Sequence, residues 1–131
     1  MSYHQLTSEE VFRHIEVVAQ YSLLPLCVYD NPGATRFDFS DELHARIASL
    51  PNIRSIKIPP VSMELPVMRA RLARLREKLA LHVRVEISGD SFAAVGIAAG
   101  CEAWNSVIGG AFSLIQQGHF CVGLRHKTRL R

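Results

Sequence analysis

LLPLCVY (Leu23–Tyr29) and IRSIKI (Ile53–Ile58) are the two short apolar stretches that decide the fold. Each is followed at once by residues that end regular structure: an Asp-Asn-Pro-Gly turn after the first and two prolines after the second. Nearly continuous apolar runs of this length are typical of strands that are buried on both faces, as in a parallel sheet. We therefore expect two parallel strands, one ending at Tyr29 and the other close to Lys57.

Helical patterns alternate with these runs up to about residue 110. Thr7 and Ser40 are expected N-caps, and Pro66 fits the first turn of a third helix. The other elements that we expect are strands at Val83–Ser88 and Ala103–Ile108 and a short helix at Ser91–Ala99. The first three strand ends recur about every 30 residues, which is the length of one βα unit.

The length and composition are those of one soluble globular domain without a membrane segment. The chain has 131 residues, 48% of them apolar, and a formal net charge of +3. No apolar stretch approaches the ~20 residues of a membrane span, and the N-terminus does not resemble a secretory signal. Three scattered cysteines predict reduced thiols, so we expect a cytoplasmic protein.

Lys57 and Tyr29 are the residues with the clearest chemical potential, because active sites of parallel α/β folds lie at the carboxyl ends of strands. A lysine in dry surroundings loses its charge, and its neutral amine can attack a carbonyl to form a Schiff base. A phenol on the neighbouring strand can relay a proton. The alternatives are an edge-strand lysine that discourages aggregation and an interior tyrosine with a satisfied hydroxyl.

Other ligand classes find little support in the sequence. The six histidines lack metal-ligand spacing, and His14 and His44 are expected on solvated helix faces. No glycine-rich loop with nucleotide-binding spacing follows a strand. The arginine-rich segment 69–78 has no interleaved aromatic residues, so we expect neither nucleic acid nor metal as a partner.

Several segments together resemble the dihydrodipicolinate synthase / N-acetylneuraminate lyase family of class I Schiff-base aldolases. They are Leu24–Pro32, Phe39–Leu43, Leu50–Lys57, Ser88-Gly89-Asp90 and the last expected strand, which contains Ser106. The family pattern has a strand ending in Tyr-Asn-x-Pro, and the next strand ends in a lysine. The spacing between the two motifs agrees here, and the resemblance covers roughly residues 1–110.

The resemblance implies a (β/α)₈ TIM barrel, of which this chain matches about four βα units, the second half. Residues 1–110 would form the half-barrel, and residues 111–131 a divergent, poorly ordered basic tail. Such a half leaves sheet edges and apolar surface open, which predicts a truncated product. It would aggregate, form a homo-oligomer or pair with another half-barrel.

The resemblance also implies a reaction. Lys57 would form a Schiff base with pyruvate or another 2-keto acid, and Tyr29 would relay protons, for aldol addition to an aldehyde or the reverse cleavage. Ser106, Gly89 and Asp90 would bind substrate, and no cofactor or metal would be required.

Two departures from the family pattern narrow this expectation. Asp30 stands where the family usually has asparagine. Ala34 stands where synthases carry an arginine for the aldehyde's carboxylate, and Arg36 follows two positions late. The pattern therefore favours a related aldolase or lyase. A catalytically inactive half-barrel and a small flavodoxin-like module that binds a ligand or partner are the alternatives, and strand order separates the latter from a barrel.

Overall fold

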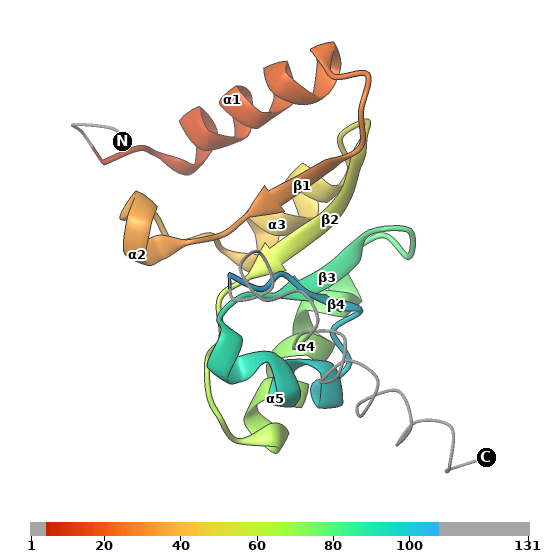
Figure 1. Ribbon diagram of the computed structural model, residues 1–131. Coiled ribbons are helices and arrows are strands. Elements are labelled where there is room, and N and C mark those ends of the chain that lie inside the picture. The colour runs from red at the N-terminus through yellow and green to blue at the C-terminus, as the bar shows by residue number, and fades with distance from the viewer. Residues whose placement is uncertain (1–4, 108–131) are drawn as a thin grey trace.

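Helices and strands alternate along the chain in the computed structural model, which describes residues 5–107 (Figure 1). In chain order the elements are α1 (Ser8–Tyr21), β1 (Leu26–Tyr29), α2 (Pro32–Thr35), α3 (Asp41–Ala48), β2 (Ile53–Ile58), α4 (Leu65–Lys78), β3 (Arg84–Ile87), the 3₁₀ turn η1 (Asp90–Phe92), α5 (Ala93–Ala99) and β4 (Ala103–Trp104).

The four strands form one parallel sheet in the order β1-β2-β3-β4. Consecutive strands are therefore neighbours in space, and the helices α1, α3, α4 and α5 contact one another in the same sequence. This regular progression is that of a partial α/β barrel, as predicted. A doubly wound, flavodoxin-like sheet requires a switch in strand order, and the described strands have none.

The helix starts follow the local chemistry of the sequence. The Thr7 hydroxyl accepts a hydrogen bond from the Glu10 amide, and the Glu10 carboxylate accepts one from the Thr7 amide at 2.8 Å. Ser40 accepts from the Leu43 amide at 3.1 Å, and Pro66 lies in the first turn of α4. All three predicted helix starts are thus confirmed. Within residues 5–107, no helix has both the length and the apolar character to cross a bilayer.

The first strand differs from the prediction in its start and its burial. β1 begins at Leu26, and the preceding Leu23 and Leu24 are 98% and 71% exposed. Of its four residues only Val28 is buried. The expectation of burial on both faces was wrong for β1. Among the described residues no strand pairs with its outer edge and no helix covers its second face.

Three shorter segments also differ from their predictions. The expected turn after β1 continues into the one-turn helix α2, which Arg36 ends in a left-handed conformation (φ 56°). The predicted helix 91–99 consists of η1 followed by α5, and β4 spans Ala103–Trp104. Ile108, the predicted end of that strand, and the predicted tail 111–131 lie outside the described residues.

One face of the sheet carries the core. Successive side chains of a strand point to opposite faces, and the residues that face the helices are all buried: Val28, Ile56, Ile58, Val85 and Ile87. They form two clusters, one between β1, β2, α1 and α3, the other between β2, β3, α4 and α5. The opposite face bears Cys27, Tyr29, Ser55, Lys57 and Glu86, and we call it the open face because all of these except Ser55 are half-buried or exposed.

Helix α5 packs closely against β3 because its residues are small. A Cβ added to Gly96 would lie 2.7 Å from Cγ2 of Ile87, well inside van der Waals contact. The helix therefore approaches the strand through this glycine, and it follows directly from the segment that leaves the end of β3. The close contact fixes the position of that strand end.

We expect Gly96→Ala to destabilise the fold by about 1–3 kcal/mol, because the added methyl group overpacks the α5–β3 contact. Urea unfolding followed by circular dichroism measures the change. Gly33→Ala is the matched control, since the nearest atom to its added Cβ is 3.8 Å away. Equal unfolding midpoints for the two variants would contradict this account of the packing.

Candidate active site

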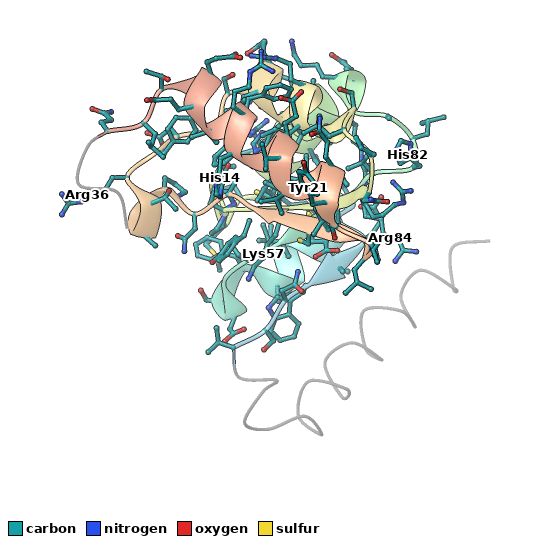
Figure 2. The ribbon with its side chains drawn as sticks, turned by 90° about the horizontal axis from the view of Figure 1, so that it is seen from above. His14, Tyr21, Arg36, Lys57, His82 and Arg84 are labelled. Atoms are coloured by element: carbon teal, nitrogen blue, oxygen red, sulfur yellow. The ribbon has the colours of Figure 1, made fainter. Side chains whose placement is uncertain are left out.

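Tyr29 and Lys57 are direct neighbours at the carboxyl ends of β1 and β2. They are register partners in the parallel ladder, and Nζ of Lys57 lies 4.0 Å from the centroid of the Tyr29 ring. Tyr29 is 46% exposed and Lys57 is half-buried. Figure 2 shows Lys57 near the middle of the molecule, whereas Arg36 and His82 lie at its periphery. The amine and the phenol ring that the sequence singled out therefore lie side by side.

Backbone hydrogen bonds hold this pair in register. The Asp30 amide donates to the Lys57 carbonyl oxygen at 2.9 Å, directly beyond Tyr29, and the Leu26 amide donates to the Asn52 carbonyl oxygen at 2.7 Å. The register shifts between Leu26 and Cys27, so the pairing that leads to Tyr29 and Lys57 starts from an irregularity in the ladder. Such irregularities re-aim the side chains that follow them.

The other predicted site residues lie at the same edge of the sheet. Gly89 and Asp90 follow β3, the next strand after that of Lys57, and Gly89 has a φ of 83°, a conformation that favours glycine. Asp90 Oδ1 accepts a hydrogen bond from the Val107 amide at 3.2 Å, which ties the end of β3 to the segment that follows β4 and contains Ser106. The structure thus brings Gly89, Asp90 and Ser106 to the edge that carries the amine. Their role in substrate binding stays a prediction.

A polar cluster on the open face was missed by the sequence analysis. The Cys27 thiol donates to Glu86 Oε2 at 3.7 Å, and the Asn105 amide group donates to the same oxygen. Glu86 is the register partner of Lys57 on β3. Burial and the Glu86 carboxylate raise the pKa of the Cys27 thiol, against a lowering by a hydrogen bond with Ser55. The alternation of polar residues in β3 was the available signal.

His44 differs most from its prediction. It is fully buried on α3 rather than solvated, and its Nε2 lies 3.3 Å from Oδ2 of Asp30. His44 follows Leu43 in the short helix α3, and both belong to the buried side of that helix together with Ile47. Its partner Asp30, which the sequence places in a turn and where the family usually has asparagine, is also buried.

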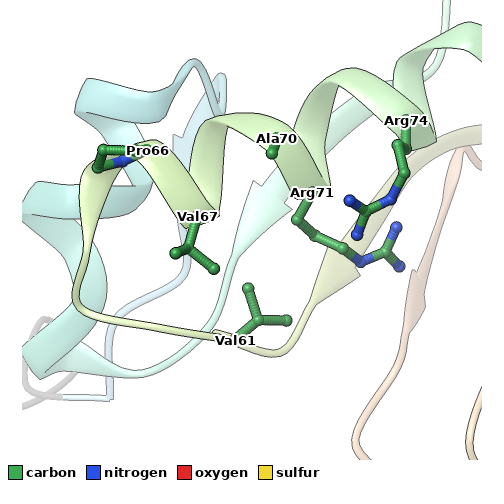
Figure 3. A pocket seen from close by; sticks show the side chains of 6 residues that line it. All are labelled: Val61, Pro66, Val67, Ala70, Arg71 and Arg74. Carbon is green, nitrogen blue, oxygen red and sulfur yellow. The ribbon is translucent and has the colours of Figure 1, made fainter.

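An apolar hollow lies away from these strand ends. It lies between α4 and the segment that follows β2, and its lining residues are Val61, Pro66, Val67, Ala70, Arg71 and Arg74 (Figure 3). Arg71 is already paired with Asp41 at 2.6 Å. This hollow shares no residue with the strand-end site. Because active sites of parallel α/β barrels lie at the carboxyl ends of strands, the strand ends are the stronger candidate for chemistry.

Fold and site together define the class of the molecule: part of an α/β barrel whose strand ends present an amine beside a phenol ring. No protein-family model matches the chain. A 4-hydroxy-tetrahydrodipicolinate synthase of Rickettsia africae is 28% identical over 106 residues, which are 81% of this chain and 34% of that protein.

Solved structures give the same result. The dihydrodipicolinate synthase of Agrobacterium tumefaciens superimposes with a TM-score of 0.89 and 38% identity, over 98% of this chain and 43% of that one. The Acinetobacter baumannii enzyme, solved in complex with pyruvate, has a TM-score of 0.64 and 30% identity, over 82% of this chain and 35% of that one. These relatives are members of the dihydrodipicolinate synthase family, and the chain resembles them over between 34% and 43% of their length.

We expect Glu86→Gln to speed alkylation of Cys27 by iodoacetamide severalfold at pH 8. The carboxylate raises the pKa of the Cys27 thiol, so its removal lowers that pKa and increases the fraction of reactive thiolate. Peptide mass mapping after timed labelling measures the rate at this cysteine alone.

Glu42→Gln serves as the control, because this glutamate pairs with Lys78 and makes no contact with Cys27. An unchanged Cys27 rate in Glu86→Gln would show that the cluster on the open face does not govern the thiol.

Proposed function

We propose that this chain carries the Schiff-base half of an aldolase, in which Lys57 condenses with pyruvate or another 2-keto acid. The observation that carries the proposal is the position of Lys57 Nζ against the Tyr29 ring at the carboxyl edge of a parallel sheet. The family relationship supports the reaction class, and the pyruvate complex of the Acinetobacter baumannii relative supports the substrate.

The chemistry begins at the amine. The neutral Nζ attacks the ketone carbon of the keto acid, and the resulting carbinolamine loses water to give an iminium ion. The iminium withdraws electrons, so the adjacent carbon loses a proton and becomes a nucleophilic enamine. This carbon forms a bond to the carbonyl carbon of an aldehyde, and hydrolysis of the new iminium releases the product and restores the amine.

Tyr29 is the proton carrier in this scheme. Each step from carbinolamine to iminium moves a proton to or from oxygen or nitrogen at the reacting centre, and a phenol can carry such a proton. The contact of the Tyr29 ring with Lys57 Nζ supports this assignment. Gly89, Asp90 and Ser106 lie along the same edge and would hold the keto acid. The scheme requires no metal or organic cofactor.

The aldehyde partner differs from that of the named relatives in this proposal. The position that would supply a cation for a second carboxylate is occupied by Ala34, and Arg36 lies at the periphery (Figure 2). Glu86 adds a negative charge to the open face close to Lys57. Both observations support an aldehyde without a carboxylate near its reactive carbon.

The uncovered parts of the half-barrel are the proposed surface for its partner. Within residues 5–107 one edge of β1 is unpaired, and Tyr21, Leu23 and Leu24, which precede this strand in the chain, are 83%, 98% and 71% exposed. Exposed apolar residues next to a free strand edge favour association with further strands. We propose that a second half-barrel, either another copy or a separate chain, covers this edge. The unpaired thiols of Cys27 and Cys101 support a reducing, cytoplasmic location.

An inactive half-barrel is the second candidate. The open face that bears Lys57 is not enclosed by the described residues, and a Schiff base forms slowly on an amine that is solvated and charged. The two candidates predict opposite results in a single trapping experiment.

We expect borohydride reduction in the presence of pyruvate to add one reduced pyruvate to Lys57, because the iminium is converted to a stable secondary amine. Intact mass and peptide mapping detect the adduct. Lys57→Arg should abolish it, and Tyr29→Phe should slow its formation by roughly a hundredfold through the loss of proton transfer.

Lys78→Arg is the matched control, since Lys78 pairs with Glu42 on the helix layer and should not affect trapping. A chain that gives no adduct under conditions where it is folded is the inactive half-barrel.

We expect the purified chain to associate through the free edge of β1. Size-exclusion chromatography with light scattering should give a mass above that of the monomer. A charge in the exposed patch, Leu24→Lys, should shift it toward the monomer. Val61→Lys, in the hollow beside α4, is the control, because Val61 is likewise an exposed apolar residue. A well-folded monomer with no concentration dependence would rule out the proposed pairing.

A further inference from the structure

Directly behind the Tyr29–Lys57 pair, on the helix side of the sheet, two ionisable side chains are buried together. Asp30 is 4% exposed and His44 is 0% exposed, and Oδ2 of Asp30 lies 3.3 Å from Nε2 of His44. Burial of a polar or charged group is costly unless it has a partner. Each of these side chains therefore lowers the cost of burying the other.

Aromatic contacts fix the orientation of the imidazole. The His44 ring stacks on Phe39 with centroids 5.3 Å apart and an interplanar angle of 12°, and Phe39 meets Phe37 edge-on at 5.0 Å. The backbone amide of His44 donates to the Ser40 carbonyl oxygen in the first turn of α3. The ring therefore has little rotational freedom, and it presents Nε2 to Asp30 from a rigid helix.

Asp30 connects this buried contact to the reactive end of the sheet. It follows Tyr29 directly, so its side chain and that of Tyr29 point to opposite faces. Its amide donates to the Lys57 carbonyl oxygen at 2.9 Å. The Asp30 side chain is held on the helix side of the sheet, and the Asp30 amide is bonded to the backbone of Lys57. Asp30 thus restrains the backbone that positions both Tyr29 and Lys57.

The contact is poorly optimised for stability alone. Within residues 5–107, Asp30 Oδ1 and both His44 ring nitrogens are buried without a hydrogen bond of good geometry. Apolar residues of similar volume in place of such a pair are often neutral or stabilising. Buried polar atoms left in this state call for an explanation beyond packing.

We propose that Asp30 and His44 are a positioning pair that holds the Tyr29 phenol ring over the Lys57 amine. The inference extends the proposed function, because the geometry that it maintains is that of the two reacting groups. In this proposal α3, which carries none of the reactive side chains, determines the orientation of the end of β1.

The test measures the Lys57–Tyr29 geometry directly. Lys57 is one of three lysines in the chain, so reductive ¹³C-methylation gives few signals, and Lys57→Arg assigns its own. The ring current of Tyr29 should displace the Lys57 methyl signal upfield, and Tyr29→Leu should remove this displacement.

The decisive variant is Asp30→Leu combined with His44→Phe, which replaces the pair by apolar groups and keeps the stacking on Phe39. We expect it to remain folded, to lose the upfield displacement, and to slow pyruvate trapping by roughly ten- to a hundredfold. Asp30→Asn keeps an oxygen toward Nε2 and should retain most of the displacement. If the double variant does not fold, Asp30→Ser, which shortens the side chain away from His44, tests the same link.

Leu72→Ala is the control for general destabilisation, since it removes buried volume from the core cluster between β2, β3, α4 and α5, to which neither Asp30 nor His44 belongs. It should lower the urea midpoint while the Lys57 signal stays in place. A folded double variant with an unchanged Lys57 signal would overturn the inference. A wild-type chain that traps no pyruvate, but whose Lys57 signal moves in the double variant, would overturn the proposed function and leave the inference intact.

Discussion

The parallel register between β1 and β2 is the constraint on which the rest of the site depends. It places Tyr29 opposite Lys57, and side-chain alternation then sends both to the face that no described helix covers. The same alternation sends Val28, Ile56 and Ile58 into the helix layer, where they form the core. From Ser55 onward, one geometric rule therefore separates the apolar groups that stabilise the sheet from the polar groups of the open face, whereas Ile53 at the start of β2 is buried in the core.

The helix layer contributes more than apolar cover. α5 approaches β3 through Gly96, and α3 brings His44 to Asp30. Both contacts act on the last residues of strands, where Tyr29, Lys57 and Gly89 lie. Rigid packing on one side of the sheet thus determines the geometry on the other side, and the open face needs few contacts of its own to keep its side chains in place.

Much of this architecture follows from local sequence patterns. Element boundaries could be predicted at the caps Thr7 and Ser40 and at the apolar run around Lys57. Capping residues and apolar runs are short-range signals, which a sequence shows directly. The burial of His44 could not be predicted in the same way, since it depends on Asp30, which lies on a different element. The start of β1 was misplaced for a related reason: Leu23 and Leu24 are apolar, but burial requires a neighbouring strand, and none of the described strands covers that edge.

The nearness of β1 and β2 along the chain has an evolutionary consequence. The phenol ring and the amine come from consecutive strands joined by α2 and α3, so one continuous segment of the chain contains both groups and the buried pair behind them. Duplication or recombination can transfer this stretch as a unit, with its relative geometry already fixed. The strands that come to lie beside it can then diverge, while the phenol ring and the amine are inherited together.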